Sequence, residues 1–101
     1  MDDGKSRQEI KSLLEAGLKT EAEPRADSAE QVEAISARLR AARDLKEKLV
    51  IAGFEDHSFQ ADGIEQDCKS CVRFLVHRRF CEVPELLLPV EPEWSCRLWR
   101  L

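Results

Sequence analysis

CKSCVRFLVHRRFCEVPELLLPVEPEWSCRLWRL, residues 68–101, is the stretch that decides how this chain folds. It contains all four cysteines of the protein, both tryptophans and two of the four phenylalanines. Cys68 and Cys71 form a C-x2-C pair, nine residues separate Cys71 from Cys81, and fourteen separate Cys81 from Cys96. Four thiols in one short apolar segment are typical of a ligand set for a metal ion or an iron–sulfur cluster.

Cysteine alone does not distinguish a zinc ion from an iron–sulfur cluster, because thiolate sulfur binds both. Zinc ribbons usually bring two C-x2-C turns together, whereas Cys81 and Cys96 stand singly among apolar and aromatic residues. Single ligands spread around an apolar pocket favour a cubane, which is larger than one ion. The spacing therefore favours a [4Fe-4S] cluster and keeps a structural Zn²⁺ as the alternative.

Two groups of residues carry a family resemblance: the C-x2-C pair with the phenylalanine and cysteine after it, and the segment around the last cysteine. They are Cys68-Lys69-Ser70-Cys71, Phe74, Cys81 and Trp94-Ser95-Cys96-Arg97-Leu98-Trp99. This pattern resembles the high-potential iron–sulfur proteins, whose last cysteine follows Gly-Trp and precedes an aromatic residue by three positions. The resemblance implies one [4Fe-4S] cluster bound by Cys68, Cys71, Cys81 and Cys96, in a small fold with little regular structure. It also implies shielding of the cluster by Phe74, Trp94 and Trp99, and we expect Phe80 to exclude water as well.

The function that follows is electron transfer, or a role as small accessory subunit of a larger redox enzyme, because small cluster-bearing subunits of glycyl-radical enzymes are similar to that fold too. The alternative is a zinc-stabilised adaptor or regulatory protein whose long helix docks a partner. With one cysteine on every iron, no coordination position remains for a substrate. The sequence also has no phosphate-binding glycine loop and no recognisable nucleophile motif, so we expect no catalytic residues and no standalone enzyme.

Helical periodicity marks the first half of the chain. Ser6 and Glu9 have the spacing of a capping box, and apolar residues follow at helical steps up to Gly17, which predicts a short helix over about 6–16. A polar linker is expected over 20–26. Ser28 then opens a second apolar stripe that ends at Gly53, which predicts one continuous helix over about 28–52.

We expect the fold class to be small α plus irregular. Residues 1–53 would form a helical arm, in which the two helices make a hairpin. Residues 54–101 would form a cluster-binding module stapled by its cofactor and similar to the high-potential proteins. Three prolines, Pro84, Pro89 and Pro92, argue against helices and central strands in that module, and Asp62-Gly63 indicates a turn before it.

Charge and hydropathy limit the classes of partner that this chain is expected to bind. The net charge is −4, with ten Lys and Arg against sixteen Asp and Glu in residues 1–67 and six against four in residues 68–101, which argues against nucleic-acid binding. No run approaches a membrane span, and the first residues lack the apolar stretch of a secretory signal, so we expect a cytoplasmic protein with reduced thiols. The narrow stripe over 28–52 predicts contact with a larger enzyme subunit or a second copy. Arg78 and Arg79 are a candidate docking patch for an acidic redox partner.

Overall fold

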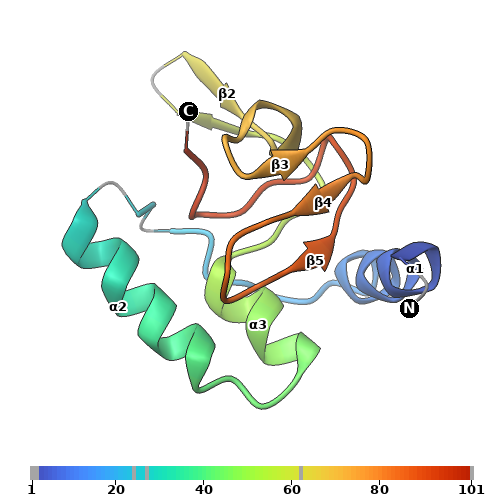
Figure 1. Ribbon diagram of the computed structural model, residues 1–101, viewed down its shortest axis with the longest axis horizontal. Helices are drawn as coiled ribbons and strands as arrows, with labels where there is room; N and C mark the ends of the chain where they lie inside the picture. The colour runs from blue at the N-terminus through green and yellow to red at the C-terminus, as the bar shows by residue number, and fades with distance from the viewer. Residues whose placement is uncertain (1–2, 24, 27, 62, 101) are drawn as a thin grey trace.

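This mixed α/β protein has three helices below and beside two small antiparallel sheets (Figure 1). The computed structural model describes residues 3–23, 25–26, 28–61 and 63–100. Within that part of the chain the helices are α1 (Asp3–Glu15), α2 (Ala29–Arg40), α3 (Leu45–Ala52) and the short 3-10 helix η1 (Cys68–Ser70). The first sheet pairs β1 (Phe59–Ala61) with β2 (Ile64–Gln66). The second has the order β3 (Phe74–Leu75), β4 (Phe80–Cys81) and β5 (Leu88–Pro89).

The C-terminal segment 92–100 is the centre of the fold, although it forms no named strand. Its backbone hydrogen-bonds four other parts of the chain. The bonds run from Cys68 N–H to Trp94 O (2.6 Å), Glu55 N–H to Ser95 O (2.9 Å), Ser95 N–H to Glu55 O (3.0 Å), Arg97 N–H to Ala52 O (2.9 Å) and Ala26 N–H to Arg97 O (3.0 Å). This segment therefore satisfies its polar backbone through partners that are distant in sequence.

One hydrophobic core joins the helices to the cysteine-rich part. Its buried members include Ile10, Leu14, Ile35, Leu39, Leu49, Ala52, Phe54, Val90, Trp94 and Leu98. These residues come from all three helices and from the C-terminal half, so a single core spans the residue 53 boundary drawn from composition. None of the helices in the described part of the chain is both long and apolar enough to cross a membrane.

The prediction of one continuous helix over 28–52 was wrong. α2 ends at Arg40, and α3 begins at Leu45 after a new N-cap, Asp44. The Asp44 carboxylate accepts a hydrogen bond from Glu47 N–H (2.9 Å), and the Glu47 carboxylate accepts one from Arg43 N–H (2.6 Å). This reciprocal capping fixes a second helix start inside the predicted helix, because each carboxylate satisfies an otherwise unpaired backbone donor. The two ends of the predicted helix were correct, because Ser28 caps α2 and Gly53 ends α3 in the left-handed conformation.

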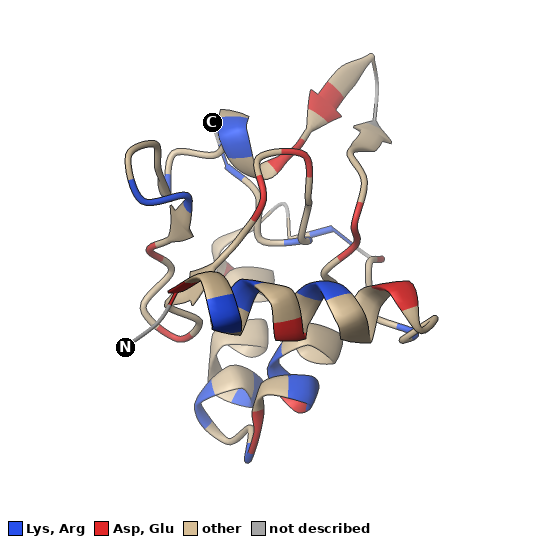
Figure 2. Ribbon diagram, turned by 90° about the vertical axis from the view of Figure 1, so that its right-hand side faces the viewer, with Lys and Arg blue, Asp and Glu red and all other residues tan. Residues whose placement is uncertain are grey.

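The predicted hairpin between the first helix and the second was also wrong. α1 packs against β5, and it is α2 and α3 that pair with each other. Arg7 of α1 donates from Nε to Val90 O (3.1 Å), just beyond β5. Figure 2 shows acidic and basic residues alternating along α1, whose apolar residues Ile10 and Leu14 are buried. α1 begins at Asp3, earlier than the predicted cap, and Gly17 beyond its end has a φ of +91° as expected.

Gly53 links the end of α3 to the segment that precedes α2. Its φ is +68°, and a Cβ added there would collide with the carbonyl oxygen of Glu21. Glu21 N–H also donates to Val50 O (2.9 Å), so the predicted linker is attached to α3. Pro24 of that linker lies outside the described residues, as does Asp62 of the predicted turn. Pro89 is in β5, at the edge of its sheet, where a missing N–H leaves no ladder bond unmade.

Candidate cluster-binding site

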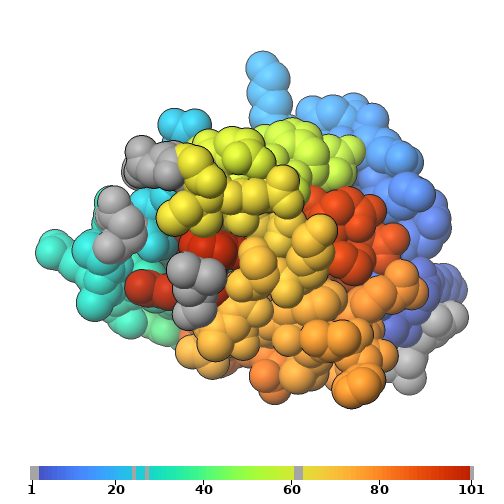
Figure 3. All heavy atoms as spheres, turned by 90° about the horizontal axis from the view of Figure 1, so that it is seen from above, coloured from blue at the N-terminus to red at the C-terminus, as the bar shows by residue number. Residues whose placement is uncertain are grey.

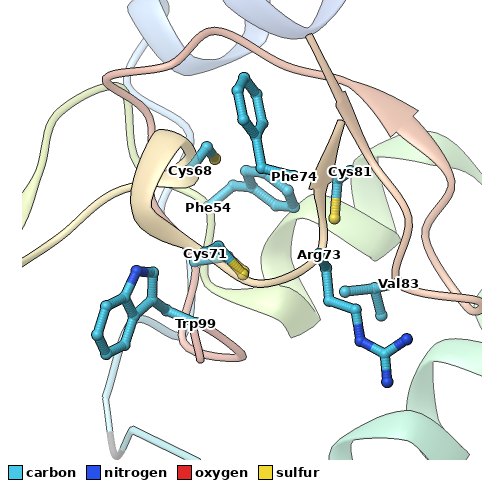
Figure 4. A pocket seen from close by; sticks show the side chains of 9 residues that line it. Phe54, Cys68, Cys71, Arg73, Phe74, Cys81, Val83 and Trp99 are labelled. Atoms are coloured by element: carbon cyan, nitrogen blue, oxygen red, sulfur yellow. The ribbon is translucent and has the colours of Figure 1, made fainter. Parts of the chain in front are cut away.

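All four cysteines line one cavity, shown in Figure 4. Cys68 begins η1, Cys71 follows its end, Cys81 is the last residue of β4, and Cys96 comes from the central segment. About 10 Å³ of the cavity is open to a water-sized group, which is room for about one water molecule. Cys68, Cys81 and Cys96 are buried, Cys71 is partly exposed, and none of the four forms a disulfide. The chain thus brings together the four residues that sequence analysis grouped as a ligand set.

The C-x2-C turn is held by a small hydrogen-bond network. Asp67 caps η1, and its carboxylate accepts from Ser70 N–H (3.1 Å) and from the Ser70 hydroxyl (2.8 Å). The Ser70 oxygen in turn accepts from the Trp99 indole N–H (2.9 Å). Cys71 N–H closes the turn on Cys68 O (3.1 Å). The first two cysteines are therefore fixed by a cap whose second partner comes from the far end of the chain.

Apolar side chains form most of the cavity wall. The wall residues other than cysteine are Phe54, Arg73, Phe74, Val83 and Trp99. Of the four residues predicted to shield a cluster, Phe74 and Trp99 lie in this wall. Phe80 and Trp94 are buried but do not line the cavity. In the view of Figure 4, the ring of Phe54 lies between Cys68 and Cys71 on one side and Cys81 on the other.

Burial favours the neutral form of three of the thiols, Cys68, Cys81 and Cys96. Burial raises the pKa of Cys81 to about 11 and the pKa of Cys96 to about 12. Burial, followed by the three neighbouring thiols, raises the pKa of Cys68 well above its ordinary value. Backbone N–H groups of Val83 and Leu98 hydrogen-bond Cys81 and Cys96 respectively, which lowers both pKa values against the larger effect of burial. A cation bound beside these three sulfurs would favour their deprotonated form, because thiolate is the form that ligates metal.

Two arginines place positive charge beside the sulfurs. Arg73 is in the cavity wall and Arg25 is beside Cys96, and each acts against burial to lower the pKa of the cysteine it faces. Arg25 is fixed by hydrogen bonds from Nη2 to Cys96 O (2.8 Å) and to Gln66 Oε1 (2.9 Å). A thiolate-bound cluster is anionic, so these guanidinium groups would stabilise it.

The side chains are not gathered tightly around one point. Among the described residues, no three His, Cys, Asp or Glu side chains lie close enough together to hold a single metal ion.

Arg78 and Arg79, the predicted docking patch, lie outside the cavity and pair with carboxylates of this chain. Arg78 Nε is 2.7 Å from Asp3 Oδ2, and Arg79 Nη1 is 3.1 Å from Glu91 Oε1. Arg78 also stacks over the ring of Phe80, at 3.8 Å from the ring centroid. Much of their positive charge is therefore used to hold α1 and the loop after β5.

The comparisons with known proteins give no assignment: no family model matches the chain, and neither the curated proteins nor the solved structures contain a match.

Sequence reasoning missed several residues that build the site. Asp67 and Ser70 form a capping box around the C-x2-C pair, and the D-x-x-S spacing was a signal that could have revealed it. Arg25 and Phe54 come from outside the cysteine-rich stretch. No local pattern connects them to the cysteines, because only the tertiary fold brings them there.

Proposed function

We propose that this protein binds one [4Fe-4S] cluster through Cys68, Cys71, Cys81 and Cys96. The observation that carries this proposal is the convergence of four free thiols on one apolar-walled cavity. When bound, such a cluster supplies one-electron transfer. We infer that the protein serves as an electron carrier or as the small accessory subunit of a larger redox enzyme.

The chain's own residues suit that role. Phe74 and Trp99 exclude water from the cavity, and burial with amide hydrogen bonds sets the potential of thiolate-bound iron. The backbone N–H groups of Val83 and Leu98 already point at two of the sulfurs. Arg25 and Arg73 contribute positive charge. These residues orient, shield and charge-balance the ligands without any open position for substrate chemistry.

The spacing of the cysteines along the chain, with Cys81 and Cys96 standing singly, favours a cluster over a single zinc ion. Zinc needs four sulfurs at about 2.3 Å from one centre, which forces them close together. The described side chains do not include three ligands so arranged, although all four cysteines share the cavity. A multi-iron cluster spans a wider set of sulfurs than one ion does, and metal and sulfide analysis distinguishes the two.

We also propose that the cysteine-rich part is similar to the high-potential iron–sulfur proteins. Short strands and a C-terminal segment without a ladder support it, as does the position of Phe74 and Trp99 beside the ligands. The helices α1, α2 and α3 share a core with that part of the chain. We infer that they adapt a cluster-binding unit to a specific partner.

Spectroscopy on protein purified without oxygen tests the proposal. We expect broad visible absorbance and an EPR signal in one of the two redox states. A signal in the oxidised form would indicate the high-potential couple, and a signal in the reduced form the low-potential couple.

The four single Cys→Ser variants provide the matched set for that experiment, because each should lose the absorbance. Lys11→Glu on α1, an exposed position away from the cavity, is the control and should keep it. A colourless protein that holds one zinc would contradict the cluster and support the adaptor function instead.

A further inference from the structure

A second cavity lies directly beside the cysteines, between α2 and the end of the chain. Its apolar floor includes Val32 of α2, Val72, Val83 and Leu98, and we call it the α2 groove. It measures about 210 Å³. Figure 3 shows C-terminal residues in red beside α2 in teal on this side of the molecule. The groove shares Val83 and one arginine, Arg73, with the wall of the cysteine cavity.

The charge of the α2 groove is positive and available. Arg73 and Arg100 line it, both are exposed, and neither makes a salt bridge to another described residue. The carboxylate that the structure places in the groove, Glu85, faces Arg40 at 3.6 Å. This contrasts with Arg78 and Arg79, whose charges are paired internally. In a protein with a net charge of −4, the groove is therefore a local site for an anionic group.

One apolar side chain of the groove is strongly exposed, and a second exposed apolar residue lies four positions further along the chain. Val72, which lines the groove, is 63% exposed, and Val76, just after β3, is 70% exposed. Cys71 is the one ligand candidate that is not fully buried. Apolar exposure next to two arginines that pair with no described carboxylate is the composition of a protein-docking surface, in which apolar contacts give area and charges give orientation.

We propose that the α2 groove is the docking site for an acidic segment of the partner protein, one that carries apolar side chains flanked by carboxylates. The inference rests on the proposed function, because the partner meant is the one that exchanges electrons with the cluster or holds this chain as a subunit. The shared wall residues Arg73 and Val83 put such a segment next to the ligands. A free inorganic anion would use the arginines but leave the apolar floor uncovered.

A binding experiment with defined peptides tests this on the full chain. The probe is a fluorescein-labelled acidic peptide, DELLED, with KKLLKK and DESSED as charge-reversed and apolar-deleted counterparts. Fluorescence anisotropy at low salt should show DELLED binding about tenfold more tightly than KKLLKK, and more tightly than DESSED. Added salt should weaken the binding, because exposed charges are screened.

Variants locate the binding. Arg100→Glu together with Arg73→Glu should weaken DELLED about tenfold, since like charges then face each other. Val72→Ser should weaken it without changing the charge, and its exposed position protects the fold. Lys11→Glu makes the same charge change on α1 as one arginine variant and should leave the affinity unchanged.

Equal binding of DELLED and KKLLKK would overturn the proposal, and so would an equal loss in Lys11→Glu. Equal binding of DESSED, displaced by inorganic phosphate, would also overturn it by showing an anion site only. Iron content is measured on the same preparation. Protein without iron would contradict the cluster but would still report on the groove, so the two failures are distinguishable.

Discussion

The helices and the cysteine-rich part of this protein are organised by different means. α2 and α3 start and stop through local chemistry, with Ser28, Asp44 and Gly53 fixing their ends within a few residues. Residues 68–100 have strands of only two residues and take their shape from bonds to distant segments and from four buried or half-buried thiols. We therefore expect the second region to depend on the proposed cluster, whereas the helices depend on capping and the shared core.

Replacement of a ligand should have the largest effect. We expect Cys96→Ser to lose the cofactor, because it removes one of four sulfurs and places a hydroxyl in a buried site. The shared core predicts that the helices lose stability in the same transition. Iron analysis and thermal unfolding followed by circular dichroism measure both effects.

Ser36→Ala, which changes a buried serine of α2, is the control and should keep iron. A Cys96→Ser protein with full iron content would remove Cys96 from the ligand set. Two separate unfolding transitions would instead show that the helices are independent of the cysteine-rich part.

Loss of a contact between the two regions should have the next largest effect on stability. Phe54 is buried, follows α3, and lines the cysteine cavity. Phe54→Ala should destabilise the protein by about 3–5 kcal/mol through loss of buried area and creation of a void. Urea unfolding of the protein with its cofactor bound measures this change in the free energy of unfolding. Phe59→Ala, in the β1–β2 hairpin outside the cavity wall, is the comparison, and an equal loss there would contradict the special position of Phe54.

The pH dependence should separate the two regions in protein prepared without metal. Because folding raises the pKa of Cys81 to about 11 and of Cys96 to about 12, the thiols stabilise the fold below their ordinary pKa of 9.0. That stability should fall as pH rises from 9 through 11 and 12. The Glu21 carboxylate shows the opposite sign. The Arg38 hydrogen bond lowers its pKa, so its contribution is lost as pH falls below 4.5.

Thermal unfolding across this pH range measures the alkaline and acid losses together. Cys81→Ala should reduce the alkaline loss and leave the acid loss unchanged, while Glu21→Gln should do the reverse. A flat alkaline limb in the metal-free protein would contradict burial of neutral thiols.

Removal of a helix N-cap should have the smallest effect on stability. Asp44→Ala removes the N-cap of α3 and Asp67→Ala the N-cap of η1, and each should cost about 1 kcal/mol. Only Asp67→Ala should also speed the loss of cofactor, because its cap positions Cys68 and Cys71. The rate of iron loss to a chelator, compared between the two variants, checks this. Equal rates would contradict a role of the Asp67 cap at the site.

Local patterns allowed the helix ends at Ser28, Gly17 and Gly53 to be predicted, because capping and left-handed glycine are short-range effects. The same logic applied to Asp44 and Glu47 would have divided the second helix, but the unbroken apolar stripe concealed it. Packing of α1 on β5 could not be predicted from its periodicity, which shows that one face is buried and not what covers it.

The grouping of four cysteines could be predicted because they are concentrated in one apolar segment. The contributions of Arg25 and Phe54 could not, because bonds to the central segment and the core bring them from elsewhere in the chain. The predicted partner surface over 28–52 rested on an uncovered apolar stripe. Ile35, Leu39 and Leu49 of that stripe are buried within the chain, so the stripe is no longer a reason to expect a partner there. Contact of residues 28–52 with a partner stays a prediction.

Iron and acid-labile sulfide content, measured on full-length protein purified without oxygen, tests the central claim most directly. The account predicts about four irons and four sulfides per chain, as in a cubane with one cysteine on each iron. One zinc per chain with no sulfide would contradict it, and so would four thiols that all react with a thiol reagent in protein free of metal.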